Sequence, residues 1–241
     1  MKLLAIEAAT EACSVALWID GDVRERFEIA PRRHAELVLP WAEALLDEAR
    51  IAKSQLDAIA VGRGPGAFTG VRLAIALAQG IALALDIPVV PVSTLAALAS
   101  GSPPLPPAGA GLGEGGALVI AAIDARMGEI YFGTFARDAS GLVTPFDSEQ
   151  LARPDAVVLR DGRDCIGVGT GFAADDGALV KALGGRLLRH DASALPHAAD
   201  VVRLAARAFA NGEAVAPEHI DPAYLRDKVA LTLVEQRAAR G

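Results

Sequence analysis

The sequence predicts an α/β protein made of two similar α/β units. Short apolar runs of strand length alternate with stretches long enough for helices. A Pro/Gly-rich segment at residues 101–116 divides the chain, and the order of strand, acidic residue and glycine-rich turn then begins again. At 241 residues, the chain is long enough for two small domains with real cores.

Three segments of strand length open the chain, at residues 3–7, 13–19 and 23–29, and the first of them is a short apolar run. A polar turn at residues 8–11 separates the first two runs, and the pair Gly21-Asp22 separates the second from the third. Runs of this length joined by turn residues are typical of consecutive antiparallel strands. We therefore expect a three-stranded antiparallel meander at the start of the first unit.

Helices and further strands complete the first unit. Residues 34–50 carry apolar side chains at helical spacing, and Pro40 either kinks this helix or marks its first turn. Buried strands are expected at residues 58–61 and 88–92, and Ser93 is placed to cap a short helix after the second of them.

The most apolar stretch of the chain covers residues 71–85. Its side chains are apolar on nearly every side, which predicts a helix covered on more than one side. Fifteen residues are too few to cross a bilayer, which needs about 20. We therefore expect no membrane span here.

The second unit repeats this order after the Pro/Gly-rich segment. Strands are expected at residues 117–124, 129–135 and 165–168, and helices at 176–183 and 199–210. We expect an N-terminal domain at residues 1–100, a linker or loop at 101–116, a C-terminal domain at 117–226 and a tail at 227–241. The last part of the C-terminal domain could pack back on the first.

The two halves can be aligned with each other. Glu7 matches Asp124, and residues 59–64 match residues 166–171. The two shifts differ only by the length of a loop, so the order of features survives. Two such units facing each other form the actin-like arrangement that sugar kinases also have. Chance similarity between strands rich in Ala, Gly and Val is the alternative.

Composition narrows the class of protein. The net charge is −7 and 52% of the residues are hydrophobic, which describes a folded soluble protein and disfavours a general nucleic-acid binder. Cys13 and Cys165 each lie in an apolar run, so we expect two buried free thiols in a reducing compartment. The apolar start is too short for a signal peptide, and we expect a cytoplasmic protein.

Acidic residues end the first strand of each unit, where working ATPases of this architecture hold magnesium beside a phosphate loop. Glu7 is one methylene longer than aspartate, and the turn Ala8-Ala9-Thr10 has no glycine that would let backbone N–H groups surround an anion. We interpret Glu7 and Asp124 as vestigial acidic positions, and we expect no cofactor.

A glycine-rich turn joins a buried strand to the apolar helix. It either shapes the strand-to-helix connection or contacts an anion at the helix N-terminus, and both interpretations stay open. Arg72 lies in the first turn of that helix, against the helix dipole, so we expect it to pair with an acid or an anion. The turn residues concerned are Gly62, Arg63, Gly64, Pro65, Gly66, Thr69 and Gly70.

The sequence lacks the patterns of the common hydrolase and metalloenzyme sites. None of the four histidines forms an i, i+4 pair, so no helix presents two imidazoles to a metal. Ser14 and Ser93 lack the surroundings of a nucleophile elbow. We therefore expect neither a catalytic residue nor a metal site.

Four segments of the chain resemble those of one protein family. They are LAIEAATEACSVAL at residues 4–17, RGPGAFTGVR at 63–72, AIDARMGEIY at 122–131 and PAYLR at 222–226. On these segments, which span nearly the whole chain in order, the sequence is identified as a member of the TsaB family, also called YeaZ. Glu7 departs from the family's usual aspartate, which further weakens any nucleotide role.

This resemblance implies two actin-like (ASKHA, ribonuclease H-like) domains and a non-catalytic scaffold role in making threonylcarbamoyladenosine (t6A) in tRNA. Such a subunit binds and stabilises the catalytic subunit TsaD, the ATPase TsaE joins them, and tRNA is contacted only within the complex. Alone it forms a homodimer through the same N-terminal helices. The interface residues that this implies are His34, Leu37, Val38, Trp41, Leu45, Val71, Arg72 and Ile75.

Two other functions compete with the scaffold role. A stand-alone ATPase or kinase would use Glu7 and Asp124, and tight binding of magnesium-ATP by the isolated chain would favour it. A peptidase would need a metal or nucleophile arrangement that the sequence does not offer.

Overall fold

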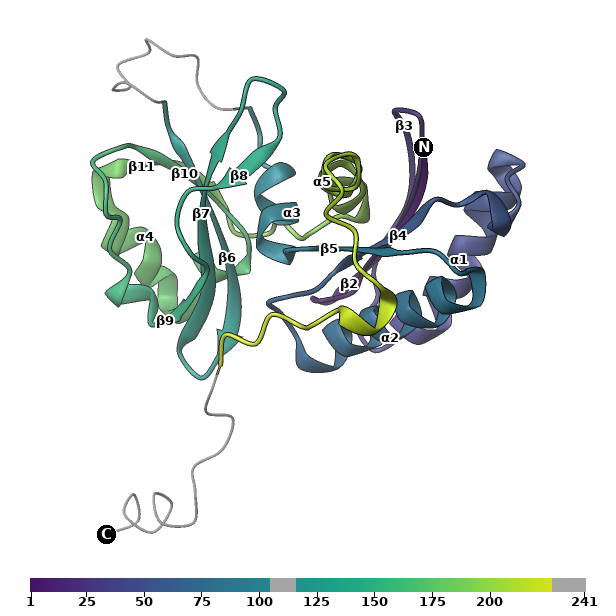
Figure 1. Cartoon of the computed structure of the whole chain (residues 1–241). Helices are drawn as coiled ribbons and strands as arrows, with labels where there is room; N and C mark the ends of the chain where they lie inside the picture. The colour runs from purple at the N-terminus through teal and green to yellow at the C-terminus, as the bar shows by residue number, and fades with distance from the viewer. Residues whose placement is uncertain (105–115, 227–241) are drawn as a thin grey trace, which may run out of the picture.

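The computed structural model describes residues 1–104 and 116–226, which form two mixed β-sheets with helices between them and on their outer faces (Figure 1). The tail expected at residues 227–241 and most of the linker expected at 101–116 lie outside the described residues.

The first sheet has the strand order β3-β2-β1-β4-β5. Its first three strands are antiparallel, and β4 and β5 run parallel to β1, so the predicted meander is confirmed. Asp20 and Gly21 form the second turn of the meander at φ 47° and 109°. The strands are β1 (Lys2–Glu7), β2 (Ala12–Ile19), β3 (Asp22–Ile29), β4 (Ala58–Gly62) and β5 (Val89–Val92).

The second sheet repeats the first. Its order β11-β10-β6-β7-β8 is that of the first sheet read from the other edge, and β9 pairs with β7 beside it. The predicted duplication is therefore confirmed. The strands are β6 (Leu118–Arg126), β7 (Glu129–Arg137), β8 (Val143–Pro145), β9 (Gln150–Ala152), β10 (Cys165–Val168) and β11 (Leu187–Asp191).

Five α-helices are described, with short 3-10 turns between elements. Pro40 lies inside α1. The Ser93 Oγ accepts a hydrogen bond of 3.1 Å from the Ala96 N–H, which confirms the predicted cap. The α-helices are α1 (His34–Ala49), α2 (Phe68–Leu85), α3 (Thr94–Ser100), α4 (Ala178–Leu183) and α5 (Ala198–Ala210). The 3-10 turns are η1 (Lys53–Gln55), η2 (Pro154–Ala156), η3 (Thr170–Phe172), η4 (Ala174–Gly177), η5 (Gly184–Arg186) and η6 (Pro217–His219).

Helices α3 and α5 lie between the two sheets (Figure 1). The central core joins Leu3 of the first sheet and Val119 of the second to Leu95 of α3 and Val201 of α5, all of them fully buried. Although α5 follows the second sheet in sequence, it packs mainly on β1 and β2 of the first.

Two polar residues of the first sheet cap the start of α5. The Ala198 N–H donates to the Ser14 Oγ at 2.9 Å, and the Ala199 N–H donates to the Glu25 Oε1 at 3.0 Å. The His197 Nδ1 lies 3.0 Å from the Glu25 Oε2, and its ring stacks on Phe27. These contacts satisfy N–H groups that a helix start leaves free, and they fix α5 to the sheet.

Helices α1 and α2 cover the outer face of the first sheet, and α4 packs over the outer face of the second. The helix α2 begins three residues earlier than predicted and has 18 residues, of which six are buried. Within this chain α2 is covered on its inner side and much of its remaining surface is exposed, so cover on a second side stays a prediction that requires a partner. By length and composition alone α2 could cross a membrane, a test that core helices of soluble proteins also pass.

Candidate functional site

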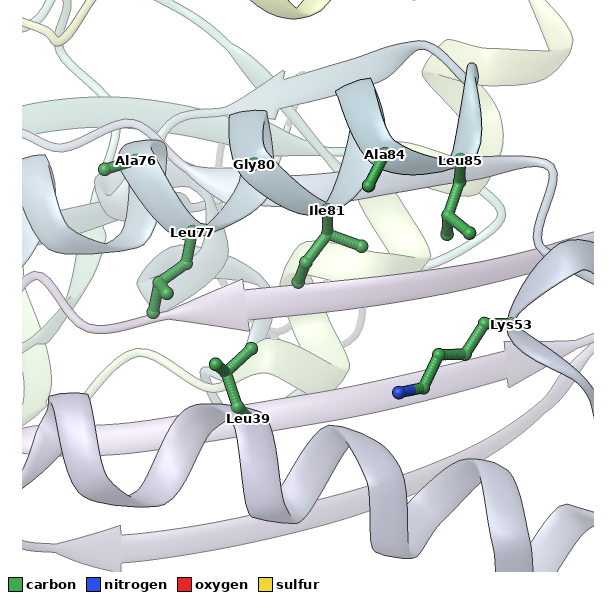
Figure 2. A pocket seen from close by; sticks show the side chains of 8 residues that line it. All are labelled: Leu39, Lys53, Ala76, Leu77, Gly80, Ile81, Ala84 and Leu85. Atoms are coloured by element: carbon green, nitrogen blue, oxygen red, sulfur yellow. The ribbon is translucent and has the colours of Figure 1, made fainter.

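An apolar groove lies between α1 and α2 on the outer surface of the first domain. We name it the α1–α2 groove, and it has a volume of about 350 Å³. Figure 2 shows Leu39 of α1 and Leu77 and Ile81 of α2 pointing toward each other across it. The lining residues are Leu39, Lys53, Ala76, Leu77, Gly80, Ile81, Ala84 and Leu85.

The groove exists because α2 is apolar on both sides. Val71, Ala74 and Ala78 on its inner side are buried in the outer core of the first domain. Ala76, Gly80 and Ala84 follow one another at a spacing of four residues, so they form a low ridge on one side of the helix. Leu39 in the groove is 44% exposed, and Leu83, elsewhere on α2, is 62% exposed. Apolar surface gathered in this way marks an interaction site more often than scattered apolar residues do.

The structure places the predicted interface residues on two different sides of the helices. Val38 and Leu45 of α1, and Val71 and Ile75 of α2, are buried in the chain's own core. They cannot be surface contacts in this conformation, because the first sheet covers them. Leu37 and Trp41 are half-buried, and Arg72 is exposed.

His34, another predicted interface residue, is also buried, and it holds the turn between β1 and β2. Its Nε2 lies 3.0 Å from the Thr10 carbonyl oxygen and 3.1 Å from that of Ala12. A single ring N–H can serve both carbonyl groups, so the imidazole secures the end of the meander.

Sequence reasoning named none of the residues that line the groove. The apolar character of α2 on all sides did indicate that a surface other than the chain's own sheet would pack against this helix. Val38 is buried in the core, whereas the next residue, Leu39, lies at the surface. Helical spacing alone did not show which of these two neighbours faces outward.

The glycine-rich turn packs against the turn between β1 and β2. The Ala67 N–H donates to the Ala9 carbonyl oxygen at 2.7 Å. A β-carbon on Gly66 would stand 2.4 Å from that same oxygen, and one on Gly70 would stand 1.9 Å from the Ala8 carbonyl oxygen. These glycines allow two stretches of backbone to touch, which favours the structural interpretation of the turn over anion contact.

Glu7 is fully buried at the end of β1, beside that turn. Its Oε1 accepts a hydrogen bond from the Ala9 N–H at 2.7 Å, and its Oε2 accepts one from the Thr94 Oγ1 at 3.0 Å. The Gly64 N–H in turn donates to the Thr94 Oγ1 at 3.2 Å. Burial raises the pKa of Glu7 to about 7, although these hydrogen bonds oppose the rise.

Asp124 does not occupy the position in the second sheet that corresponds to Glu7. Ile6 pairs with Val61 in the first sheet, whereas Ala121 pairs with Val168 in the second. When Val61 is matched to Val168, the residue of the second sheet that corresponds to Glu7 is Ala122. The predicted equivalence of Glu7 and Asp124 is therefore displaced by two residues. The reason is that β6 runs further than β1, and Asp124 lies near its tip in an ion pair with Arg126 at 3.0 Å.

The partners of Arg72 are aromatic. Its Nε and Nη2 donate to the Tyr224 hydroxyl at 3.0 and 2.8 Å, and its guanidinium lies 3.7 Å from the centre of the Phe68 ring. The expectation of an acid partner is wrong in the described part of the chain. A phenol oxygen and a ring face accept the guanidinium instead.

Within residues 1–104 and 116–226, no group of three His, Cys, Asp or Glu side chains could hold a metal ion. Cys13 and Cys165 are buried free thiols, as predicted. Burial raises the pKa of both to about 11, so neither is a ready nucleophile.

Comparison with known proteins gives consistent matches along nearly the whole chain. A family model described as "TsaD: tRNA N6-adenosine threonylcarbamoyltransferase" matches residues 28–232. The chain is 41% identical to the tRNA threonylcarbamoyladenosine biosynthesis protein TsaB of Escherichia coli over 95% of this chain and 96% of that one. The protein of the same name from Haemophilus influenzae is 37% identical, with 95% of each chain covered.

A solved structure is similarly close. The structure of YeaZ from Pseudomonas aeruginosa is 44% identical, with a TM-score of 0.80, over 93% of this chain and 99% of that one. Proteins named as the transferase itself match a smaller part. That of Chlorobaculum tepidum is 35% identical over 39% of this chain and 31% of its own length.

Proposed function

This chain belongs to the TsaB (YeaZ) family and has its duplicated actin-like fold, and from that premise we propose that it is a non-catalytic subunit in the formation of t6A in tRNA. In this role it binds and stabilises a TsaD-like catalytic subunit, and a TsaE-like ATPase joins the two. Contact with tRNA occurs only within that complex, in the cytoplasm.

The exposed α1–α2 groove is the observation that carries the proposal. Leu39, Leu77 and Ile81 offer an apolar surface that a protein partner would remove from water. Gly80 stands in the ridge of small residues, and a β-carbon there would meet nothing within 4 Å. A partner helix can therefore approach the α2 backbone closely, as it does where small residues line a helix contact.

The nature of the partner follows from the family match. This chain matches a family model named for the transferase, and one transferase is 35% identical to it over 39% of this chain, so we expect a TsaD-like subunit to have a related fold with a similar pair of outer helices. Two related helix pairs can pack around a pseudo-twofold axis, and two copies of this chain can pack in the same way. The groove therefore serves the catalytic subunit in the complex and a second copy when the chain is alone.

The absence of a catalytic role is supported by the closed end of β1. The Glu7 carboxyl faces the chain's own Ala9 N–H and Thr94 hydroxyl, which leaves it a buried structural group. The glycine-rich turn fills the space beside it with backbone. A nucleotide phosphate would have to displace both.

Reconstitution tests the role directly. Purified TsaD-like and TsaE-like proteins, a threonylcarbamoyl-adenylate synthase and tRNA are mixed with and without this chain, and t6A is measured. We expect modification only when this chain is present. Equal modification without it would overturn the scaffold role. Tight binding of magnesium-ATP to the isolated chain, measured by calorimetry, would favour the ATPase or kinase alternative.

Substitutions in the groove test its placement. We expect Leu39→Asp and Ile81→Asp to abolish co-elution with the TsaD-like subunit in size-exclusion chromatography, because each places a charge in a desolvated contact. Val158→Asp is the control, since Val158 is 80% exposed on the second domain. Variants that remain folded and still co-elute would move the interface elsewhere.

A further inference from the structure

The segment that follows α5 runs from the first domain to the second. We name residues 214–226 the C-terminal strap. In Figure 1 it leaves α5, passes along α2 toward the start of that helix and reaches the lower end of β6 and β7. Its contacts fall into three groups, one at each stage of that path.

The first group fixes the strap to the first domain. Val215 and Val89 exchange two backbone hydrogen bonds of 2.8 and 2.9 Å at the edge of the first sheet. The Gln79 Nε2 of α2 donates to the Pro217 carbonyl oxygen at 2.8 Å, and Ile220 is buried in the outer core of that domain.

The second group lies at the start of α2. The Ala223 N–H donates to the Arg63 carbonyl oxygen in the glycine-rich turn at 2.9 Å. The Tyr224 hydroxyl accepts both hydrogen bonds from Arg72, whose guanidinium lies 3.7 Å from the centre of the Phe68 ring and 5.7 Å from that of Tyr224.

The third group reaches the second domain at the hairpin that joins β6 and β7. The Arg226 side chain is only 17% exposed, and its Nη1 lies 2.9 Å from the Glu129 Oε2. Its Nη2 donates to the Ala125 carbonyl oxygen at 3.0 Å, and its Nη1 lies 3.5 Å from the Met127 Sδ. One arginine therefore contacts both sides of the hairpin turn.

We propose that the C-terminal strap is a conformational brace that fixes the β6–β7 hairpin of the second domain against the start of α2 in the first. Tyr224 and Arg226 stand two residues apart, so the tie to α2 and the tie to the hairpin are joined by a single short length of chain. Any shift of the hairpin away from the first domain must pull on Tyr224 or break the Arg226 contacts. This inference does not depend on the proposed function, because it concerns the isolated chain.

Hydrogen exchange of the isolated protein, followed by mass spectrometry, tests the brace. For Arg226→Ala we expect amides of residues 124–131 to exchange about fivefold faster or more, while α4 and α1 keep their rates. For Tyr224→Phe, which keeps the ring and removes the hydroxyl, we expect faster exchange at Ala223 and at residues 124–131. Arg33→Ala is the matched control, since Arg33 forms exposed ion pairs with Glu28 and Glu36 in the first domain.

Two results would overturn the brace. Unchanged exchange at residues 124–131 in both variants would mean that the hairpin is held by its own sheet. An equal rise in exchange throughout the chain, with a matching fall in melting temperature, would mean that these residues contribute only to global stability.

Discussion

Gly62 lies directly against the carboxyl group of Glu7, so that a β-carbon on Gly62 would stand 1.9 Å from the Glu7 Oε2. The two residues end neighbouring parallel strands, β4 and β1. The missing side chain of one provides the space for the longer side chain of the other. The extra methylene of glutamate is thus accommodated inside the protein, where the carboxyl links β1 to Thr94 of α3.

We expect Gly62→Ala to destabilise the protein by about 1–3 kcal/mol, because the new methyl group overlaps a buried carboxyl that has little room to move. Urea unfolding measures the change. In a double-mutant cycle with Glu7→Ala, the cost of Gly62→Ala should fall by at least about 1 kcal/mol, because its obstacle is gone. Strictly additive costs would show that the methyl group clashes with something else.

Glu7 should make stability depend on pH. Its pKa is about 7 in the folded protein against 4.5 unfolded, so the folded state binds the proton more tightly. The stabilisation by this proton is complete below pH 4.5 and is lost as the pH rises through 7. Relative to Glu7→Gln, the natural protein should lose about 3 kcal/mol of unfolding free energy between about pH 4 and pH 8. A difference between the two proteins that is constant over this range would contradict the raised pKa.

His197 and Glu25 should be coupled in a pH-dependent way. The hydrogen bond to Glu25 raises the pKa of His197, a stabilisation that is complete below pH 6.5 and lost at higher pH. Burial of Glu25 acts against its ionisation, but bonds from His197 and Ser14 still lower its pKa, a stabilisation lost below pH 4.5. The coupling is therefore greatest between about pH 4.5 and pH 6.5.

A double-mutant cycle of His197→Gln and Glu25→Gln measures this coupling. The His197 side chain is 39% exposed, so solvent screening should limit the coupling energy to about 0.5–1 kcal/mol near pH 5.5. It should be smaller near pH 8.5, because the imidazolium of His197, whose pKa is raised, is lost as the pH rises. Coupling of the same size at both pH values would show that no charge is involved.

Gly80→Leu should separate folding from association. Gly80 is exposed in the middle of α2, so leucine should stabilise the helix by about 0.5–1 kcal/mol. The same side chain occupies the α1–α2 groove, and binding to the TsaD-like subunit should weaken at least about tenfold. Gly80→Ala is the control, with similar stabilisation and a smaller effect on binding. Loss of stability, or unchanged binding by Gly80→Leu, would contradict the proposed contact.

Much of the fold could be predicted, because apolar runs of strand length occur in the same order in both halves. The strand β11 was missed because most of its residues are exposed, and an exposed edge strand carries no apolar run. The placement of α5 also could not be predicted. The spacing of its apolar residues indicates that one side of α5 is buried. Which of the two sheets it packs on depends on the path of the chain between the two units, and the spacing does not show that path.

The two helices that line the candidate groove were expected from the sequence, whereas the residues that line it were not. The apolar composition of α2 indicated a helix that needs a partner, and the exposed groove agrees with that need. Val38, which was expected at the interface, is buried in the chain's own core beside the exposed Leu39. Because α1 is apolar on two sides, its spacing did not identify the inner one. The partner of Arg72 lies 152 residues away, and no local pattern could have indicated Tyr224.

The return of α5 to the first sheet has a consequence for synthesis. The inner face of β1 and β2 is completed by residues that the ribosome makes only after the entire second sheet. If the first meander forms during synthesis, the apolar inner face of β1 and β2 therefore stays exposed until residues 198–210 leave the ribosome. Premature release at the boundary between the halves should yield insoluble product, and the early chain is a natural client for chaperones that shield exposed apolar faces.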